Sequence, residues 1–154
     1  NWALLSTDFE YAAKVAHRVR PSPDNAPMGI EVCNFVYALK HCLLGDWQQA
    51  DDLISDTFRR HPNGEPKKRG YPRNYYTLSW ALAGIIRQDD ALFNDGLARQ
   101  LAFYRGYAEG EAADTDEQYF CDNATALAVL AKKTGLTIAV EGDYLVSALL
   151  SDNG

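Results

Sequence analysis

The amino-acid sequence predicts an all-α domain of stacked antiparallel helical hairpins, with about six or seven helices. Apolar residues recur with helical spacing along most of the chain. Turn signals such as Gly45-Asp46 separate neighbouring helical segments and supply both a helix end and a helix start. Two pairs of these segments also align at an offset of 43 residues, as between Ala38 and Ala81. Such an offset is typical of helical-hairpin repeats, whose units span roughly 34 to 47 residues.

Length and composition predict one helical domain covering residues 1–154. Of the 154 residues, 47% are hydrophobic and 23% are charged. That is enough apolar material for one buried core, and it argues against disorder. The chain begins with Asn1 rather than methionine, which indicates a trimmed or partial chain.

The first two helices are predicted on either side of a proline-rich segment, residues 21–25. In the first, Ser6 or Thr7 provides the cap. Its apolar stripe consists of Leu5, Phe9, Ala12, Ala16 and Val19. Residues 27–44 are apolar at nearly every position, which indicates a central helix packed on most sides. Its narrow polar line consists of Glu31, Asn34 and His41.

Two hairpins follow from the turn signals. The first joins the central helix, through Gly45-Asp46, to a helix whose apolar stripe is Trp47, Ala50, Ile54 and Phe58. Residues 61–73, with three prolines and two glycines, predict a long exposed loop. Asn74 then caps a fourth helix, and residues 88–90 provide the turn into a fifth. The stripe of this fifth helix is Phe93, Leu97, Leu101, Tyr104 and Ala108.

The carboxyl-terminal third predicts one further long helix. An acidic loop, residues 109–117, leads into it, Asp114, Thr115 or Asp116 caps it, and Gly135 ends it. Residues 136–140 have a β preference but no strand partner in the sequence, so we expect a short extended segment. Residues 144–150 predict a short terminal helix.

No motif predicts catalysis, a cofactor or a metal. The three histidines lack metal-binding spacing, and glycine-rich phosphate loops and a GxSxG elbow are absent from the sequence. Three cysteines at wide spacings do not form a disulfide framework, which favours a reducing cytoplasm. We therefore expect a protein that is not an enzyme and needs no cofactor.

The charge balance limits the partners. Fifteen basic residues stand against 21 acidic ones, a net charge of −6, which argues against general binding of nucleic acid or of an anionic membrane surface. No apolar run approaches the roughly 18 residues that a membrane-spanning helix needs. A highly charged partner of this chain is expected to be basic.

Two segments are candidates for binding a partner protein. The acidic loop places five carboxylates within a short stretch, where they can meet basic groups: Glu109, Glu111, Asp114, Asp116 and Glu117. Its spacing is not that of a calcium-binding EF-hand loop. The second segment combines aromatic and arginine side chains, which make good interface anchors: Tyr71, Arg73, Tyr75 and Tyr76. A solvated connector and an ordinary polar loop are the alternative interpretations.

The chain resembles a family of all-helical bacterial immunity proteins, catalogued as immunity protein forty-nine. The resemblance lies in the turn over residues 38–47, the helix over 123–136, the extended residues 138–140 and the end over 144–150. It implies a protein that binds a cognate toxin of a bacterial polymorphic-toxin system and blocks it without catalysis. The toxin's identity, the mode of inhibition and the oligomeric state stay open.

A second hypothesis is a tetratricopeptide-like adaptor or chaperone. Such a protein would hold a peptide or a cellular protein in a concave surface, lined here by Tyr75, Tyr76, Trp80 and Tyr104. A third class, an α-helical enzyme, requires a pocket with convergent titratable groups, and no sequence motif predicts one.

Overall fold

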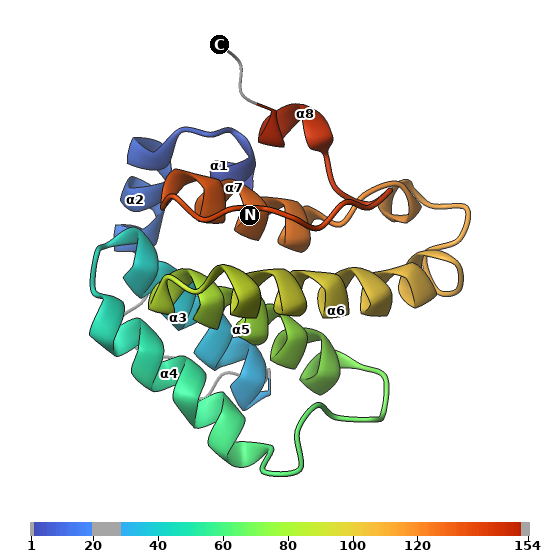
Figure 1. Ribbon diagram of the computed structural model, residues 1–154, viewed down its shortest axis with the longest axis horizontal. Helices are drawn as coiled ribbons and strands as arrows, with labels where there is room; N and C mark the ends of the chain where they lie inside the picture. Colours follow the sequence, from blue (N-terminus) through green and yellow to red (C-terminus); the bar gives the residue numbers. More distant parts are fainter. Residues whose placement is uncertain (1, 20–28, 152–154) are drawn as a thin grey trace.

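The computed structural model describes residues 2–19 and 29–151, and within them every regular element is a helix, as the sequence predicts (Figure 1). The predicted helix end at residues 21–25 lies outside the described residues. The elements are α1 (Trp2–Leu5), α2 (Phe9–Arg18), α3 (Ile30–Leu43), α4 (Trp47–Arg60), α5 (Tyr71–Arg87), α6 (Asp90–Ala108), the 3₁₀-helix η1 (Asp116–Gln118), α7 (Asp122–Lys133) and α8 (Ser147–Leu150).

The two predicted hairpins are α3–α4 and α5–α6, and they pack on each other with α5 against both α3 and α4. Helix α7 covers α5 and α6 on the other side and also packs against α1, so an amino-terminal helix meets a helix of the carboxyl-terminal third (Figure 1). The core runs through the middle of this arrangement. Its fully buried side chains include Ile54, Leu82, Phe93, Leu97 and Leu127.

The two hairpin turns, which lie 43 residues apart in the sequence, have the same backbone geometry. Gly45 and Gln88 occupy equivalent positions, with left-handed φ angles of 78° and 53°. In each turn the next residue, Asp46 or Asp89, donates its amide to the carbonyl five residues earlier, at 2.9 Å. Both aspartates then cap the following helix by accepting a backbone N–H. The two turns therefore repeat in structure as well as in sequence.

The two turns differ in the residue at the left-handed position, which is glycine at 45 and glutamine at 88. Only glycine adopts such a φ without steric cost, so the backbone at Gln88 is strained. We expect Gln88→Gly to raise the free energy of unfolding by about 0.5–1 kcal/mol. Gln88→Ala is the control, because it removes the same side-chain hydrogen bond to the Ile85 carbonyl but keeps the left-handed strain. Urea unfolding of the three proteins measures the difference, and a glycine variant no more stable than the alanine variant would contradict this account.

Helices α5 and α6 approach each other backbone to backbone through two glycines. A Cβ placed on Gly84 would lie 2.3 Å from the backbone nitrogen of Phe93, and one on Gly96 would lie 2.3 Å from that of Ala81. Real Cβ atoms do not approach other atoms this closely, so neither position has room for a side chain. Because Gly84 and Gly96 have no side chains, helices α5 and α6 can pack at this short separation.

The polar line of α3 faces α4 rather than solvent. Asn34 is buried and donates its amide to Asp56 Oδ2 and Thr57 Oγ1, both at 3.1 Å. Glu31 lies 2.9 Å from the ring of His61, which follows α4. The polar residues that interrupt the apolar pattern of this helix therefore join it to its hairpin partner.

Three predicted helix starts are wrong. Residues 5–19 are not one helix, because Thr7 has a φ of 57° and Asp8, not Ser6 or Thr7, caps α2. Helix α5 begins at Tyr71 after Gly70, three residues before the predicted cap Asn74. Helix α7 begins after Cys121, whose sulfur accepts the amide of Ala124 at 3.5 Å. Residues 114–116 instead form turns and the start of η1.

The predicted extended segment lies along the start of α6, and the described residues contain no strand with which it pairs. The side chain of Asn94 in α6 binds the backbone of this segment instead. Its amide donates to the carbonyl of Thr137 at 2.8 Å, and its oxygen accepts the backbone N–H of Ala139 at 2.7 Å. The terminal helix is α8, shorter than predicted.

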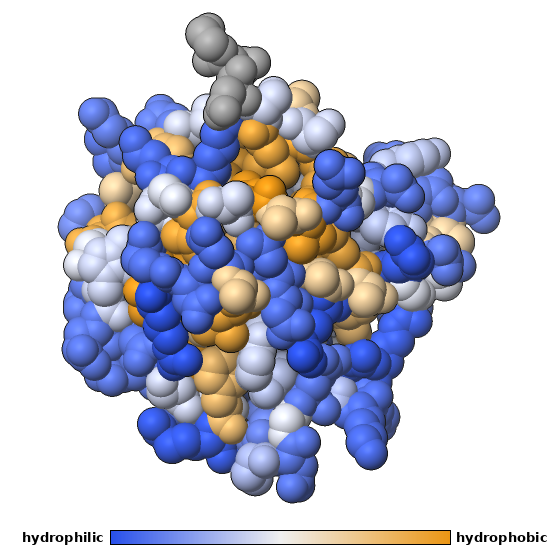
Figure 2. All heavy atoms as spheres, in the orientation of Figure 1, coloured by the Kyte–Doolittle hydropathy of each residue, from blue (hydrophilic) through white to orange (hydrophobic). Residues whose placement is uncertain are grey.

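The surface is mixed in character. On the face in Figure 2, hydrophobic residues gather where α7 and the carboxyl-terminal segment lie, whereas the region of α4 is mainly hydrophilic. None of the helices in the described ranges is long and apolar enough to cross a bilayer.

Candidate functional site

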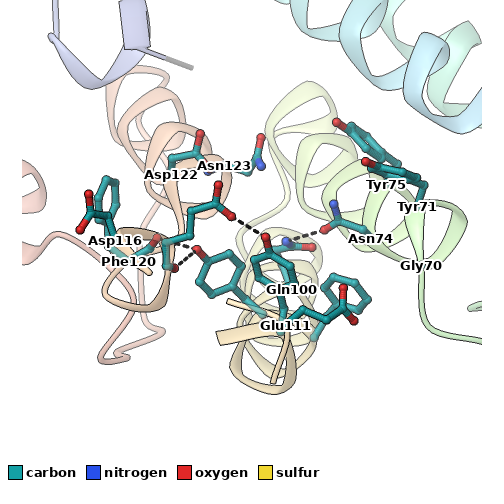
Figure 3. Close-up of a pocket in the computed structure, with 14 residues that line it drawn as sticks. Gly70, Tyr71, Asn74, Tyr75, Gln100, Glu111, Asp116, Phe120, Asp122 and Asn123 are labelled. Atoms are coloured by element: carbon teal, nitrogen blue, oxygen red, sulfur yellow. Dashed lines mark hydrogen bonds between the residues drawn. The ribbon is translucent and has the colours of Figure 1, made fainter. Parts of the chain in front are cut away.

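A pocket of about 770 Å³ opens between α5, α6, α7 and the loop that joins α6 to α7 (Figure 3). Aromatic rings form much of its wall: Tyr71, Tyr75, Phe103, Tyr104, Tyr107 and Phe120. Carboxylates and amides form the rest, together with Gly70: Glu111, Asp116, Glu117, Asp122, Asn74, Gln100 and Asn123. In Figure 3, Asp122 and Asn123 lie across the pocket from Tyr71 and Tyr75.

The first turns of α5 supply one wall. Gly70 has a φ of 137°, which favours glycine, and it turns the chain from the 61–69 loop into the helix. Tyr71 and Tyr75 are four residues apart and so share a helix face, with ring centroids 6.4 Å apart. Tyr71 is 74% exposed and stands at the rim, while Tyr75 packs edge-on against Phe35 of α3.

Helix α6 supplies the opposite aromatic wall and holds the acidic loop. The Tyr104 hydroxyl lies within hydrogen-bond distance of the Glu117 and Phe120 carbonyls, and burial raises the pKa of Tyr104, so its proton is retained at neutral pH. The Tyr107 hydroxyl donates to the Glu117 carboxylate, and this bond raises the pKa of Tyr107. Two tyrosines one helical turn apart thus fix the loop over the pocket.

The floor is polar and buried. Gln100 is 1% exposed, donates its amide to Asn74 Oδ1 at 2.9 Å and accepts the hydroxyl of Thr77. Cys121 lies beside it, 4.0 Å from the Gln100 amide, and burial raises the pKa of its thiol to about 11. A thiol with this pKa stays protonated at pH 7, which suits a helix cap rather than a nucleophile.

The pocket is acidic. Of the described residues that line it, four carry a carboxylate and none is lysine, arginine or histidine. A cation does lie near the rim: the Arg69 guanidinium is 5.8 Å from the ring centre of Phe103 and 4.0 Å from Glu111 Oε1. Both charged side chains of this pair are well exposed. The arrangement is suited to binding a positively charged group next to aromatic rings.

The structure brings together residues from both predicted binding segments. Tyr71, Tyr75, Glu111, Asp116 and Glu117 line the pocket.

The other four predicted residues lie elsewhere. Glu109 and Asp114 are exposed on the same loop but do not line the pocket. Arg73 forms an ion pair with Glu65 at 2.6 Å. Tyr76 is 3% exposed and therefore unavailable to a partner.

The concave surface predicted for an adaptor does not form from its four residues. Tyr75 and Tyr104 line the pocket, but Tyr76 and Trp80 stack on each other and pack edge-on against Phe58 of α4. They belong to the packing between α5 and α4.

Sequence reasoning missed most of the α6 and α7 contribution. Gln100, Phe103, Tyr104 and Tyr107 have the spacing of one helix face, and this signal could have been used. Asp122 and Asn123 carried no signal, because the first turn of a helix often contains such residues for capping alone.

No group of three or more histidine, cysteine, aspartate or glutamate side chains placed to hold a metal ion occurs within the described ranges. Comparisons of the chain with protein-family models, with curated proteins and with solved structures found no match.

Proposed function

We propose that this chain is a cytoplasmic bacterial immunity protein, which binds a cognate secreted toxin and neutralises it without catalysis. The observation that carries the proposal is the pocket in which the acidic loop and the tyrosines of α5 meet, although they are far apart in the sequence. The resemblance to all-helical immunity proteins supplies the class of partner.

Charge and surface chemistry support a protein partner with basic groups. Four carboxylates line the pocket and the whole chain has a net charge of −6, so a basic protein is attracted over distance and its association is accelerated. Exposed Tyr71 can bury a large area at little entropic cost when a partner covers it. Many toxin domains that attack nucleic acid are basic, which fits this surface.

The test uses the tagged protein and the product of the gene immediately upstream, which an immunity function predicts to be a large secreted toxin. Co-expression should rescue growth, and affinity purification followed by mass spectrometry should recover the toxin domain in a stoichiometric complex. If the protein neither binds nor protects against that toxin, the proposed function is wrong.

Two matched pairs of substitutions in one loop locate the binding surface. Glu111→Gln with Asp116→Asn removes two charges that line the pocket, and Glu109→Gln with Asp114→Asn removes two that do not. We expect the first pair to slow association at low salt by about tenfold and to weaken protection, and the second to change either by less than about twofold. Equal effects of the two pairs would place the toxin on another surface.

The matched hairpin turns favour a second candidate, a tetratricopeptide-like adaptor or chaperone. The same purification separates the two proposals, because an adaptor should retain several unrelated cellular proteins rather than one toxin.

A further inference from the structure

We propose that the pocket receives the guanidinium group of an arginine side chain from the partner protein, and that Arg69 competes with it at the rim. This inference rests on the proposed binding role of the pocket. It does not depend on whether the partner is a toxin.

The wall of the pocket has the two components that a guanidinium group needs. Aromatic rings come from two sides, with Tyr71 and Tyr75 on α5 and Phe103 and Tyr107 on α6. Guanidinium groups stack on such rings, and they do so at a smaller loss of hydration than an ammonium group. Carboxylates from the loop supply the second component, since a planar guanidinium can be bound by two oxygens at once.

The charge of the lining favours a positively charged ligand. Glu111 and Glu117 come from the loop, and no lysine, arginine or histidine is among the described residues that line the pocket. The hydroxyl of Tyr107 already donates to Glu117. An arginine that entered would therefore meet one carboxylate, Glu117, that a hydrogen bond already holds in place.

Arg69 already makes both kinds of contact within the chain, with an aromatic ring and with a carboxylate. Its guanidinium lies over the ring of Phe103 and beside Glu111, and it passes Gly106 and Gly110 at the carboxyl end of α6, where the helix dipole favours a cation. The separation of 4.0 Å from Glu111 is too long for a hydrogen bond, and both side chains are exposed, so the pairing is weak. A partner arginine that reached the same ring and carboxylate would displace it.

The test measures binding of three short blocked peptides to the full chain by two-dimensional NMR. The peptides carry arginine, lysine or citrulline at one position and are otherwise identical. Citrulline keeps the shape of arginine without its charge. We expect the arginine peptide to bind at least about tenfold more tightly than the citrulline peptide and severalfold more tightly than the lysine peptide. Equal affinity for arginine and either of the other two would overturn the proposal.

Paired variants locate the site. Glu111→Gln with Asp116→Asn should weaken the arginine peptide about tenfold, whereas Glu109→Gln with Asp114→Asn should change it by less than about twofold. Tyr71→Ala should weaken binding severalfold, and Tyr11→Ala, a similarly exposed tyrosine on α2, should not. Undiminished binding to the Glu111 and Asp116 double variant would overturn the proposal.

The competition has its own test. Arg69→Gln removes the rim cation, and we expect it to strengthen binding of the arginine peptide by about threefold or more. Lys67→Gln changes the net charge equally from an exposed position two residues away, and should have a smaller effect. Weaker binding to the Arg69 variant would show that Arg69 does not compete.

Toxin neutralisation without binding of the arginine peptide would refute this inference alone, and peptide binding without neutralisation would refute the proposed function alone.

Discussion

Gly96→Ala is expected to lower the free energy of unfolding by about 3 kcal/mol or more, although it adds a single methyl group. The new Cβ would lie 2.3 Å from the backbone nitrogen of Ala81, and the obstacle is main chain, which cannot rotate away. Helices α5 and α6 would have to separate, and the apolar side chains packed between them would lose contact. Urea unfolding followed by circular dichroism measures the loss.

Gly106→Ala provides the control within the same helix. A Cβ at Gly106 meets only the flexible end of Arg69, at 3.6 Å, so alanine fits there and its higher helix propensity should raise stability by about 0.5–1 kcal/mol. Opposite signs for the same substitution at the two glycines are the expected result. A Gly96→Ala protein as stable as the Gly106→Ala protein would show that the helices do not approach as closely as described.

Gln100→Leu is expected to lower the free energy of unfolding by about 2 kcal/mol, with little change in side-chain volume. The amide of Gln100 donates to Asn74 and its oxygen accepts the Thr77 hydroxyl. Gln100 and Asn74 line the pocket, and Thr77 is fully buried. Leucine removes both bonds at a position that is 1% exposed. Thermal or urea unfolding of the variant measures the loss.

A double-mutant cycle with Thr77→Val isolates the contribution of this bond. The hydroxyl of Thr77 can also reach the Asn74 carbonyl at 2.9 Å, so the coupling between Gln100 and Thr77 should be about 1 kcal/mol rather than the full cost. Gln49→Leu on the exposed surface of α4 should change stability by less than about 0.5 kcal/mol. Strictly additive effects of the Gln100 and Thr77 changes would exclude an energetic role for their hydrogen bond.

Local sequence signals were sufficient for the hairpins and insufficient for several helix starts. Asp46 was predicted correctly because it follows a glycine suited to the left-handed conformation and has no competing cap beside it. The cap of α6 was predicted only within residues 88–90, because Asp89 and Asp90 offer the same capping chemistry, and the structure uses Asp89. Asp8 was missed because Ser6 and Thr7 offer the same capping chemistry immediately before it. Cys121 was missed because its position depends on a distant contact: its amide donates to the carbonyl of Tyr144 at 2.8 Å.

The pocket could be predicted only in parts. The acidic loop and the tyrosines of α5 were each identified from residue chemistry, but their meeting depends on how closely α5 and α6 pack and on where α7 begins. The first is set by Gly84 and Gly96, which carry no binding signal in a sequence. Tyr76 was placed wrongly because it is adjacent to Tyr75, and one step along a helix turns a side chain by about 100°.

The contact between α1 and α7 connects the amino-terminal part of the described chain with the pocket. Helix α1 lies near the amino terminus, whereas α7 comes from the carboxyl-terminal third of the chain and also packs on α5 and α6. Helix α7 carries Asp122 and Asn123, one side of the pocket. Helix α7 therefore links α1 to one side of the pocket, so a substitution that loosens the packing of α1 on α7 should alter the pocket although the described residues of α1 do not line it.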